Sequence, residues 1–428
     1  MLDIQFIRTH KEEVRQNLAK RQHSPYVESF DALMLDDMKY RTLLQDAEGL
    51  RAQRNKLTQQ VAQVKDQPEA KQKLVQESKG VGEQIVQAEK NQAVLKEKIH
   101  ETLMRLPNLM EESVPFGKDD SENVEVRKWG EIKPMDFDVQ NHAQIAKNID
   151  GVEFERAVKI SGTGFFAVKG TLVLLERALQ QYALDTLMQD GFVPYAPSYL
   201  MNRAAYEGVT DLADFGNQLY KIEGEDLYLI ATSEHPLTAQ YMDETMPIQR
   251  LPIALAGISQ CFRKEVGKHG LDERGFFRVH QFNKVEQVVI CAPSESKTWH
   301  ERILANTEKM MQGLNIPYRV VNVCTGDLGI VAAKKYDIEG YSPREKKFFE
   351  LMSLSNCSTY QAVRLNIKLT HPDGKKEYVH TLNATGISTA RMLRAILENH
   401  QTQEGGIRIP EVLHPYMYGM KEIPKSNT

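Results

Sequence analysis

The chain of 428 residues has little cysteine and no long hydrophobic run. Its cysteines stand far apart and form no CxxC pair: Cys261, Cys291, Cys324 and Cys357. This usage argues against a cysteine zinc site and favours a reduced, cytoplasmic protein. The longest stretches without a charged residue cover 13 positions, at 351–363 and 378–390. Both are too short and too polar to span a bilayer, so we expect no membrane association.

An excess of charge of one sign is also missing. Lysine and arginine total 54 against 58 aspartates and glutamates, which leaves a formal net charge of −4. A uniformly basic protein that coats nucleic acid is therefore excluded, although a local basic patch is not. The first residues, with Asp3, Glu12 and Glu13, resemble neither a signal peptide nor a transit peptide. The composition, 41% hydrophobic and 26% charged, indicates a globular protein of two or three domains.

The first 110 residues predict a helical arm. Apolar residues recur at alternating steps of four and three along 43–64 and along 74–99, which is the 3.5-residue period of a coiled coil. Pro68 falls between the two runs, so we expect two long antiparallel helices joined near 66–69. From residue 50 to 110, eleven basic residues accompany seven acidic ones. This excess permits phosphate binding, but a spacer or dimerisation role for the arm is an equal alternative.

Beyond residue 150, helix and strand patterns alternate. We expect a helix at 172–187 and strands at 227–230, 258–265, 277–290, 318–324 and 365–369. The runs 258–265 and 277–290 flank a glycine-containing, charged loop, which predicts a β-hairpin with a long connection.

Side-chain alternation along this hairpin suggests a binding site. It places Arg263 and Glu265 on one face of the first strand, and the following set on one face of the second: Arg278, His280, Phe282, Lys284 and Glu286. Arg263 could hold a phosphate, Phe282 could stack on a base, and Glu286 could receive an ammonium. Spacing alone leaves an exposed, salt-bridged strand face as the alternative.

The same segment resembles motif 2 of class II aminoacyl-tRNA synthetases, in the seryl-tRNA synthetase version F-R-x-E-x-G, a loop with R-G, and R-x-H-Q-F-x-K-x-E. Other segments fit in order: 191–197 is similar to motif 1, Thr232-Ser-Glu234 to the T-x-E serine loop, and 380–401 to motif 3. The resemblance implies an α+β fold, with a class II catalytic domain on a mostly antiparallel sheet with flanking helices, plus the N-terminal antiparallel coiled-coil arm. It places a tRNA-binding arm at 1–110 and the catalytic domain at 111–428.

The resemblance implies an ATP-dependent, AMP-forming serine–tRNA ligase that works as a homodimer. Its substrates would be L-serine, ATP with Mg²⁺, and tRNA(Ser), with tRNA(Sec) as a further acceptor. An alternative is a paralogue that activates a small amino acid for a carrier protein, although such relatives lack the long arm. A non-catalytic scaffold is a third alternative, against which the intact motif residues argue.

The family's roles carry over residue by residue. Serine binding falls on Thr232, Ser233, Glu234, Arg263, Glu286, Asn383 and Thr385. ATP binding falls on Arg263, Lys264, Glu265, Val279, Phe282, Glu350, Leu351, Met352, Ser353 and Arg391. Binding of the magnesium ion that accompanies ATP is assigned to Glu350 and Ser353. The motif 2 loop, 266–274, would meet the tRNA acceptor end. The resemblance assigns binding of the tRNA body to Arg51, Lys56, Lys65, Lys71, Lys73 and Lys79.

Several positions depart from the family pattern. Met352 replaces a serine, which we expect to make the ATP side more apolar. Thr359 replaces an aspartate and Val363 an arginine, which suggests a lost ion pair. Thr385, where the family usually has serine, predicts a slightly tighter serine pocket. We expect Lys335 to be solvated.

Overall fold

The computed structural model describes residues 1–64, 67–265 and 275–427. Contacts divide the chain into two compact units. Residues 4–107 form one, which we call the arm unit, and residues 1–3 with 108–428 form the other, which we call the sheet unit. Among the described residues, no helix is long and apolar enough to cross a membrane. The predictions at Lys65 and at 266–274 lie outside the described residues.

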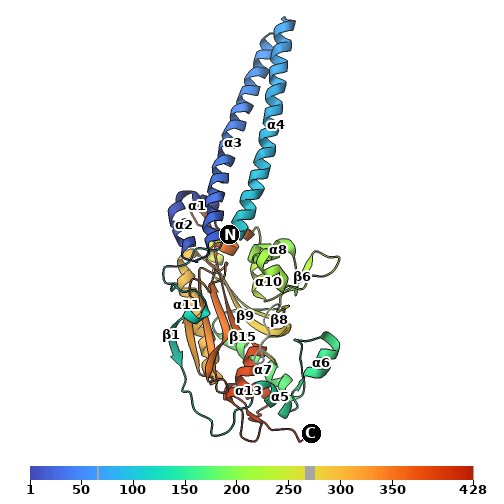
Figure 1. Cartoon of the computed structure of the whole chain (residues 1–428), viewed down its shortest axis with the longest axis vertical. Coiled ribbons are helices and arrows are strands. Elements are labelled where there is room, and N and C mark those ends of the chain that lie inside the picture. The colour runs from blue at the N-terminus through green and yellow to red at the C-terminus, as the bar shows by residue number, and fades with distance from the viewer. Residues whose placement is uncertain (65–66, 266–274, 428) are drawn as a thin grey trace. The chain divides into compact units, whose positions relative to one another are not determined.

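The arm unit contains the two long helices that the heptads predict. Its elements are α1 (Ile4–Thr9), α2 (Lys11–Ala19), α3 (Ser24–Gln63) and α4 (Pro68–Arg105), and Figure 1 shows α3 beside α4. Pro68 starts α4, a position where the missing N–H of proline costs no helical hydrogen bond. The apolar seam packs together as one cluster of Leu50, Leu57, Leu74, Val81 and Ile85. The coiled-coil prediction is confirmed.

The sheet unit is organised around one large sheet in the strand order β1-β10-β11-β12-β15-β9-β8-β4. The bounds are β1 (Val124–Trp129), β10 (Tyr318–Asn322), β11 (Lys334–Ser342), β12 (Lys347–Asn356), β15 (His380–Ser388), β9 (Gln281–Cys291), β8 (Ile253–Phe262) and β4 (Val193–Tyr195). Neighbouring strands are antiparallel from β1 to β8, and β4 runs parallel to β8. The predicted mostly antiparallel class is confirmed.

Helices cover this sheet and form its main core. The covering helices include α7 (Thr171–Gln189), α11 (Ser296–Gly313) and α13 (Thr389–Asn399). Apolar residues of these helices, among them Leu179, Ile303 and Ile396, pack in one cluster with Val289 of β9 and Leu354 of β12. The helix α5 (His142–Asn148) contacts α13. Nearby short elements are β2 (Val152–Glu153), α6 (Phe154–Ser161), β3 (Ala167–Val168), β16 (Ile407–Arg408) and β17 (Glu422–Ile423).

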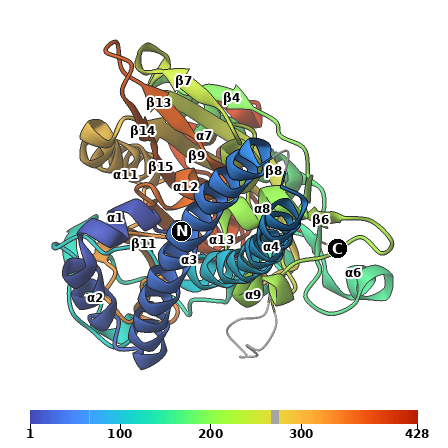
Figure 2. The ribbon, with the colours of Figure 1, turned by 90° about the horizontal axis from the view of Figure 1, so that it is seen from above.

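The sheet unit contains a second, smaller core. It joins β5 (Leu200–Asn202), α8 (Arg203–Val209), α9 (Leu212–Phe215), β6 (Leu227–Leu229), α10 (Glu234–Ala239) and α12 (Tyr360–Leu365) to a small sheet of β7 (Thr245–Pro247), β13 (Lys368–Thr370) and β14 (Lys376–Tyr378), visible in Figure 2. The predicted strand at 365–369 is wrong. Leu365 ends α12, Asn366 turns the chain with a φ of 54°, and β13 starts at Lys368. A short apolar run fits a helix end as well as a strand.

Candidate active site

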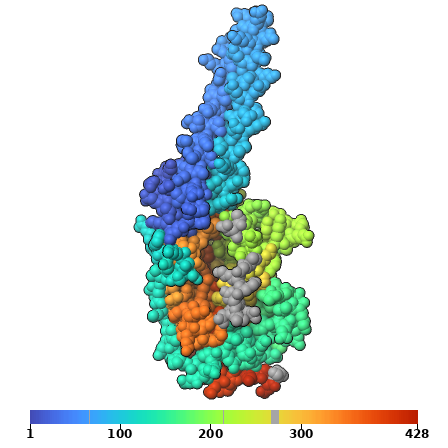
Figure 3. Space-filling model, viewed as in Figure 1, coloured from blue at the N-terminus to red at the C-terminus, as the bar shows by residue number. Residues whose placement is uncertain are grey.

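The predicted hairpin is formed by β8 and β9, which pair without a break from Ile253 opposite Ile290 to Phe262 opposite Gln281. The first strand ends at Phe262 and the second begins at Gln281. The expected strand alternation is therefore wrong for Arg263 and Glu265, and for Arg278 and His280. Glu265 instead adopts a left-handed φ of 45°. Figure 3 shows a recess on the surface beside the orange segment that contains β11 and β12.

Arg263 is held at the mouth of the hairpin. Its backbone N–H donates to the carbonyl of His280 at 2.9 Å, and its side-chain Nε donates to the carbonyl of Ala231 at 3.3 Å. The guanidinium carbon lies 5.3 Å from the centre of the Phe282 ring. These contacts fix the direction of a half-buried cation and leave further N–H groups for a ligand.

The other residues of this segment that are assigned to ATP differ in their exposure and contacts. Glu265 accepts a hydrogen bond from Arg278 at 3.4 Å, so it lies near the segment that returns into β9. Lys264 is exposed, and its ammonium lies 5.7 Å from the ring centre of Tyr220. The side chain of Val279 is buried in the main core.

A β-bulge in β12 creates one polar face for the site. Strand β11 pairs Ile338 with Met352 and Glu339 with Glu350, which leaves Leu351 as the extra residue. The bulge shifts the alternation, so Glu350 and Ser353 are both half-buried while Leu351 and Met352 are both in the core. The expectation that Met352 makes the ATP side more apolar is therefore wrong, because its side chain points into the core. Leu351 and Met352 can contact a nucleotide only through their backbone.

A row of alternating charges crosses this face. Arg391 of α13 donates to Glu350 at 2.9 Å, and Lys335 donates to Asp337 at 2.9 Å. The charge of Arg391, with help from Lys335, keeps the pKa of Glu350 below its usual value although burial opposes this. Burial raises the pKa of Asp337, and the charge of Glu350 adds to this effect. The expectation that Lys335 is solvated is wrong, because its side chain is only 21% exposed and is paired within the row.

The residues assigned to serine meet where β9 and β15 pair. Glu286 lies directly opposite Thr385, and Asn383 lies two residues from Thr385 on the same face. All three are buried, and so is Thr232 from the loop that precedes α10. Ser233 points elsewhere, with its hydroxyl donating to the carbonyl of Gly257.

Lys284 is a member of this pocket that the sequence did not assign. Its ammonium lies 2.5 Å from Glu286 Oε2 and 3.3 Å from Thr232 Oγ1. Lys284 therefore contacts two of the residues that the resemblance assigns to serine, Glu286 and Thr232. Motif matching includes this lysine but gives no role for it, and only the three-dimensional contact reveals one.

Glu234 is the most perturbed acid of the pocket. Burial first, and repulsion from Glu286 second, raise its pKa to about 7, while Gln361 donates to its carboxyl group at 2.9 Å. Lys284 and Arg263 oppose this shift in pKa, and the repulsion that remains between the two acids favours the entry of a further cation.

The structure shows where the residues that depart from the family pattern lie. Thr359 and Val363 are joined by a helical hydrogen bond of 2.8 Å in α12, so an acid and a base there would be neighbours one turn apart. Thr385 faces Glu286, so its extra methyl group lies in the pocket, while Ala384 is in the core.

We expect serine binding to weaken as the pH falls below about 7, the pKa of Glu234. A carboxylate attracts the ammonium of serine and a protonated carboxyl group does not, so the KM for serine should rise by up to about tenfold per pH unit. A pH series of serine-dependent ATP–pyrophosphate exchange measures this. In E234Q the rise should disappear, and an unchanged profile in E234Q would assign the titration to another group.

The basic residues assigned to tRNA lie on the arm unit. Lys56, Lys71, Lys73 and Lys79 are exposed. Arg51 donates to Glu89 at 2.7 Å, which links α3 to α4. Arg51 thus has a structural contact that the sequence did not indicate.

Comparison with known proteins decides the family. Residues 1–110 match the model of the seryl-tRNA synthetase N-terminal domain, and residues 219–400 match that of the class II tRNA synthetase core domain for G, H, P, S and T. The chain is 49% identical to a serine–tRNA ligase of Methanoculleus marisnigri, and the match covers 99% of this chain and 100% of that protein. The chain belongs to the seryl-tRNA synthetase family.

Solved structures of this family agree with the fold. A seryl-tRNA synthetase of Pyrococcus horikoshii complexed with ATP superposes with a TM-score of 0.96 at 43% identity, covering 100% of both chains. A cytoplasmic serine–tRNA ligase of Naegleria fowleri in complex with AMP gives a TM-score of 0.90 at 32% identity, covering 100% of this chain and 99% of that one. The predicted family, fold class and enzyme class are confirmed, and the carrier-protein alternative is not favoured.

Proposed function

We propose that this protein activates L-serine with ATP to seryl-adenylate and transfers the seryl group to the 3′ end of tRNA(Ser), with tRNA(Sec) as a further acceptor. The observation that supports this most directly is the location of Arg263. Its charge opposes the rise in the pKa of Glu234 and Glu286, which are assigned to serine, and helps to lower that of Glu350, which is assigned to ATP. One cation therefore lies within electrostatic reach of both the amino-acid groups and the nucleotide groups.

The chemistry of activation is a task of positioning and charge. A serine carboxylate oxygen attacks the α-phosphorus of ATP, and pyrophosphate leaves. Arg263 offsets the negative charge that develops at the phosphorus, and no side-chain nucleophile is needed. Glu286 and Thr232 hold the ammonium of serine. Thr385 and Asn383 pair with its hydroxyl group, so alanine would leave buried polar groups without partners.

Magnesium fits the face that carries Glu350 and Ser353. A carboxylate and a hydroxyl oxygen, both half-buried on one face, are donors of the kind that this ion takes alongside phosphates. When bound with ATP, the ion would offset the charge of the phosphate oxygens. Glu350 would hold it while remaining oriented by Arg391.

We further propose that residues 1–110 bind tRNA and that residues 111–428 form the catalytic domain. The exposed lysines of the arm unit support the first assignment. A homodimer through the motif 1 region is supported by exposed apolar side chains at Met188, Val193 and Tyr195, on the edge strand β4 and just before it. The free, buried cysteines agree with a cytoplasmic location.

The experiment that tests the function is ATP–pyrophosphate exchange with serine, threonine, alanine, glycine and cysteine, beside a charging assay with serine tRNA. Serine-dependent exchange with serylated tRNA is the expected result. Exchange without charging would overturn the ligase in favour of a carrier-protein enzyme. An absence of exchange with every amino acid would reject both.

Reversing three charges of the arm should affect only the tRNA step. In the triple variant K71E/K73E/K79E we expect the KM for tRNA to rise at least about tenfold, because three contacts to phosphates are lost, with exchange unchanged. The matched control is K128E/K133E, which reverses exposed lysines of the sheet unit. Equal effects of the two variants on tRNA would remove the arm from the binding surface.

A further inference from the structure

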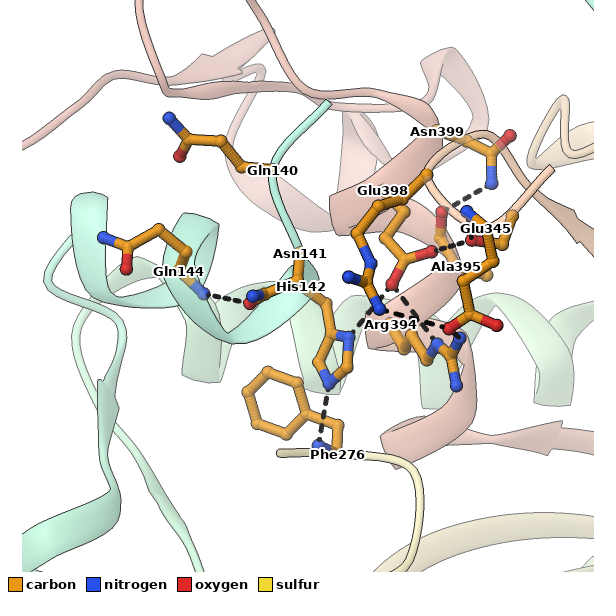
Figure 4. Close-up of polar contacts among 12 residues, drawn as sticks. Gln140, Asn141, His142, Gln144, Phe276, Glu345, Arg394, Ala395, Glu398 and Asn399 are labelled. Atoms are coloured by element: carbon orange, nitrogen blue, oxygen red, sulfur yellow. Dashed lines mark hydrogen bonds and ion pairs between the residues drawn. The ribbon is translucent and has the colours of Figure 1, made fainter. Parts of the chain in front are cut away.

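A buried polar network joins α5, α13 and the segment that enters β9 (Figure 4). His142, the first residue of α5, is 5% exposed. Its Nε2 accepts a hydrogen bond from the backbone N–H of Phe276 at 3.3 Å. Because Nε2 is the acceptor, the ring proton resides on Nδ1, which donates to Glu398 Oε1 at 3.0 Å. His142 thus links a backbone amide to a buried carboxylate.

The carboxylate end of this link is rigid. Glu398 is fully buried, and it also accepts from Ser342 Oγ at 2.5 Å and from Arg394 Nε at 3.3 Å. Arg394 donates in turn to Glu345 at 2.5 Å. A carboxylate held from three directions cannot follow a displaced partner, so it fixes the orientation of the His142 ring.

The amide end of the link adjoins the nucleotide side of the site. Phe277 follows Phe276, and its ring centre lies 5.2 Å from the guanidinium carbon of Arg391 and 4.7 Å from that of Arg394. Arg278, the next residue, pairs with Glu265. A displacement of the Phe276 backbone would therefore move two consecutive side chains that pack against residues assigned to ATP.

Close packing makes the contact specific. Gly275 has a φ of 86°, and a Cβ atom added there would lie 2.4 Å from His142 Nε2. The imidazole therefore occupies the space beside Gly275 that any larger residue would need. The backbone at Gly275 therefore lies too close to the His142 ring for a side chain to fit between them.

We propose that His142 is a positioning residue for ATP binding. By holding Phe276 it sets the place of Phe277 and Arg278, and through Glu398 and Arg394 it ties that segment to α13, the helix that carries Arg391. The proposal rests on the proposed function, because it names ATP as the ligand that this wall of the site receives.

The test separates the two hydrogen bonds of the imidazole. The side chain of glutamine can place an acceptor near the position of Nε2, that of asparagine can place a donor near the position of Nδ1, and that of leucine can do neither. We expect the calorimetric Kd for Mg²⁺–ATP to rise about tenfold in H142L and H142N, and to stay within about threefold in H142Q. The KM for serine in exchange should stay within about twofold in all three.

The matched control is H400Q. His400 directly follows α13, the helix that carries Glu398. Its Nε2 lies 2.9 Å from the carbonyl oxygen of Leu314, outside the network. We expect wild-type ATP affinity in H400Q even if its melting temperature falls.

Three results would overturn the proposal: an unchanged Kd for ATP in H142L, parallel losses of ATP and serine affinity, or better rescue by asparagine than by glutamine. If the wild type lacks serine-dependent exchange, the proposed function fails, yet calorimetry still decides the role of His142.

Discussion

Replacing Arg263 with alanine should lower serine-dependent ATP–pyrophosphate exchange by about 10³-fold or more. The guanidinium is already oriented by Ala231 and Phe282, so it stabilises developing charge without reorganising. Loss of one such donor costs on the order of 10²–10³ in rate, and alanine removes the charge together with every donor, so the loss should reach at least the upper end of that range. A lysine at this position keeps the charge but loses the paired N–H groups, so we expect R263K to lose about 10²-fold. The measurement is kcat for exchange at saturating serine and ATP.

The control for this variant is R302K. Arg302 also makes paired hydrogen bonds, to Asp190, but lies on α11 with 44% of its side chain exposed. It should keep wild-type exchange. Retention of exchange within tenfold in R263A would contradict a role for Arg263 at the phosphate.

Replacing Glu286 with glutamine should raise the KM for serine by about 10²-fold or more. The carboxylate is 1% exposed and carries the charge that the resemblance assigns to the ammonium of serine, and charge-assisted hydrogen bonds in buried sites are the strong ones. The substitution also leaves the ammonium of Lys284 without the carboxylate at 2.5 Å. We therefore expect a lower melting temperature as well, since an uncompensated buried charge destabilises the fold.

The double variant E286Q/K284M separates the two effects. It should recover stability, because both charges are gone, without recovering serine affinity. The control is E308Q, which breaks the ion pair of another largely buried glutamate, that with the more exposed Arg127. Recovery of serine binding in the double variant would show that Glu286 serves only to neutralise Lys284.

Local patterns were sufficient to predict the elements with strong periods. The seam that includes Leu57 and Val81 follows from spacing alone, and Pro68 between the runs marks the turn. The β8–β9 hairpin follows from two strand-like runs around a polar loop. Most of the candidate site residues follow from the family motifs, because residues such as Arg263 and Glu286 belong to fixed local strings.

Features that depend on distant partners were missed. Lys284 has a role only because Thr232, 52 positions away, lies beside its ammonium. His142 meets Glu398 across 256 positions, and no local string links the two. The bulge at Leu351 is set by pairing with β11, so no pattern within the strand itself indicates that Met352 lies in the core. Such contacts arise from tertiary packing, and the spacing of residues along one segment carries no information about them.

The bulge at Leu351 also limits how this strand can evolve. Substitution within the apolar pair Leu351–Met352 changes core volume and leaves the pleat intact. Deletion of either residue would restore regular alternation and move the preceding residues by one position, which exchanges the faces of Phe349 and Glu350. The acid assigned to ATP and magnesium would then point into the core, and an aromatic ring would point into the candidate site. Substitution at these two positions therefore costs packing energy, whereas a change in the length of β12 would rearrange the site itself.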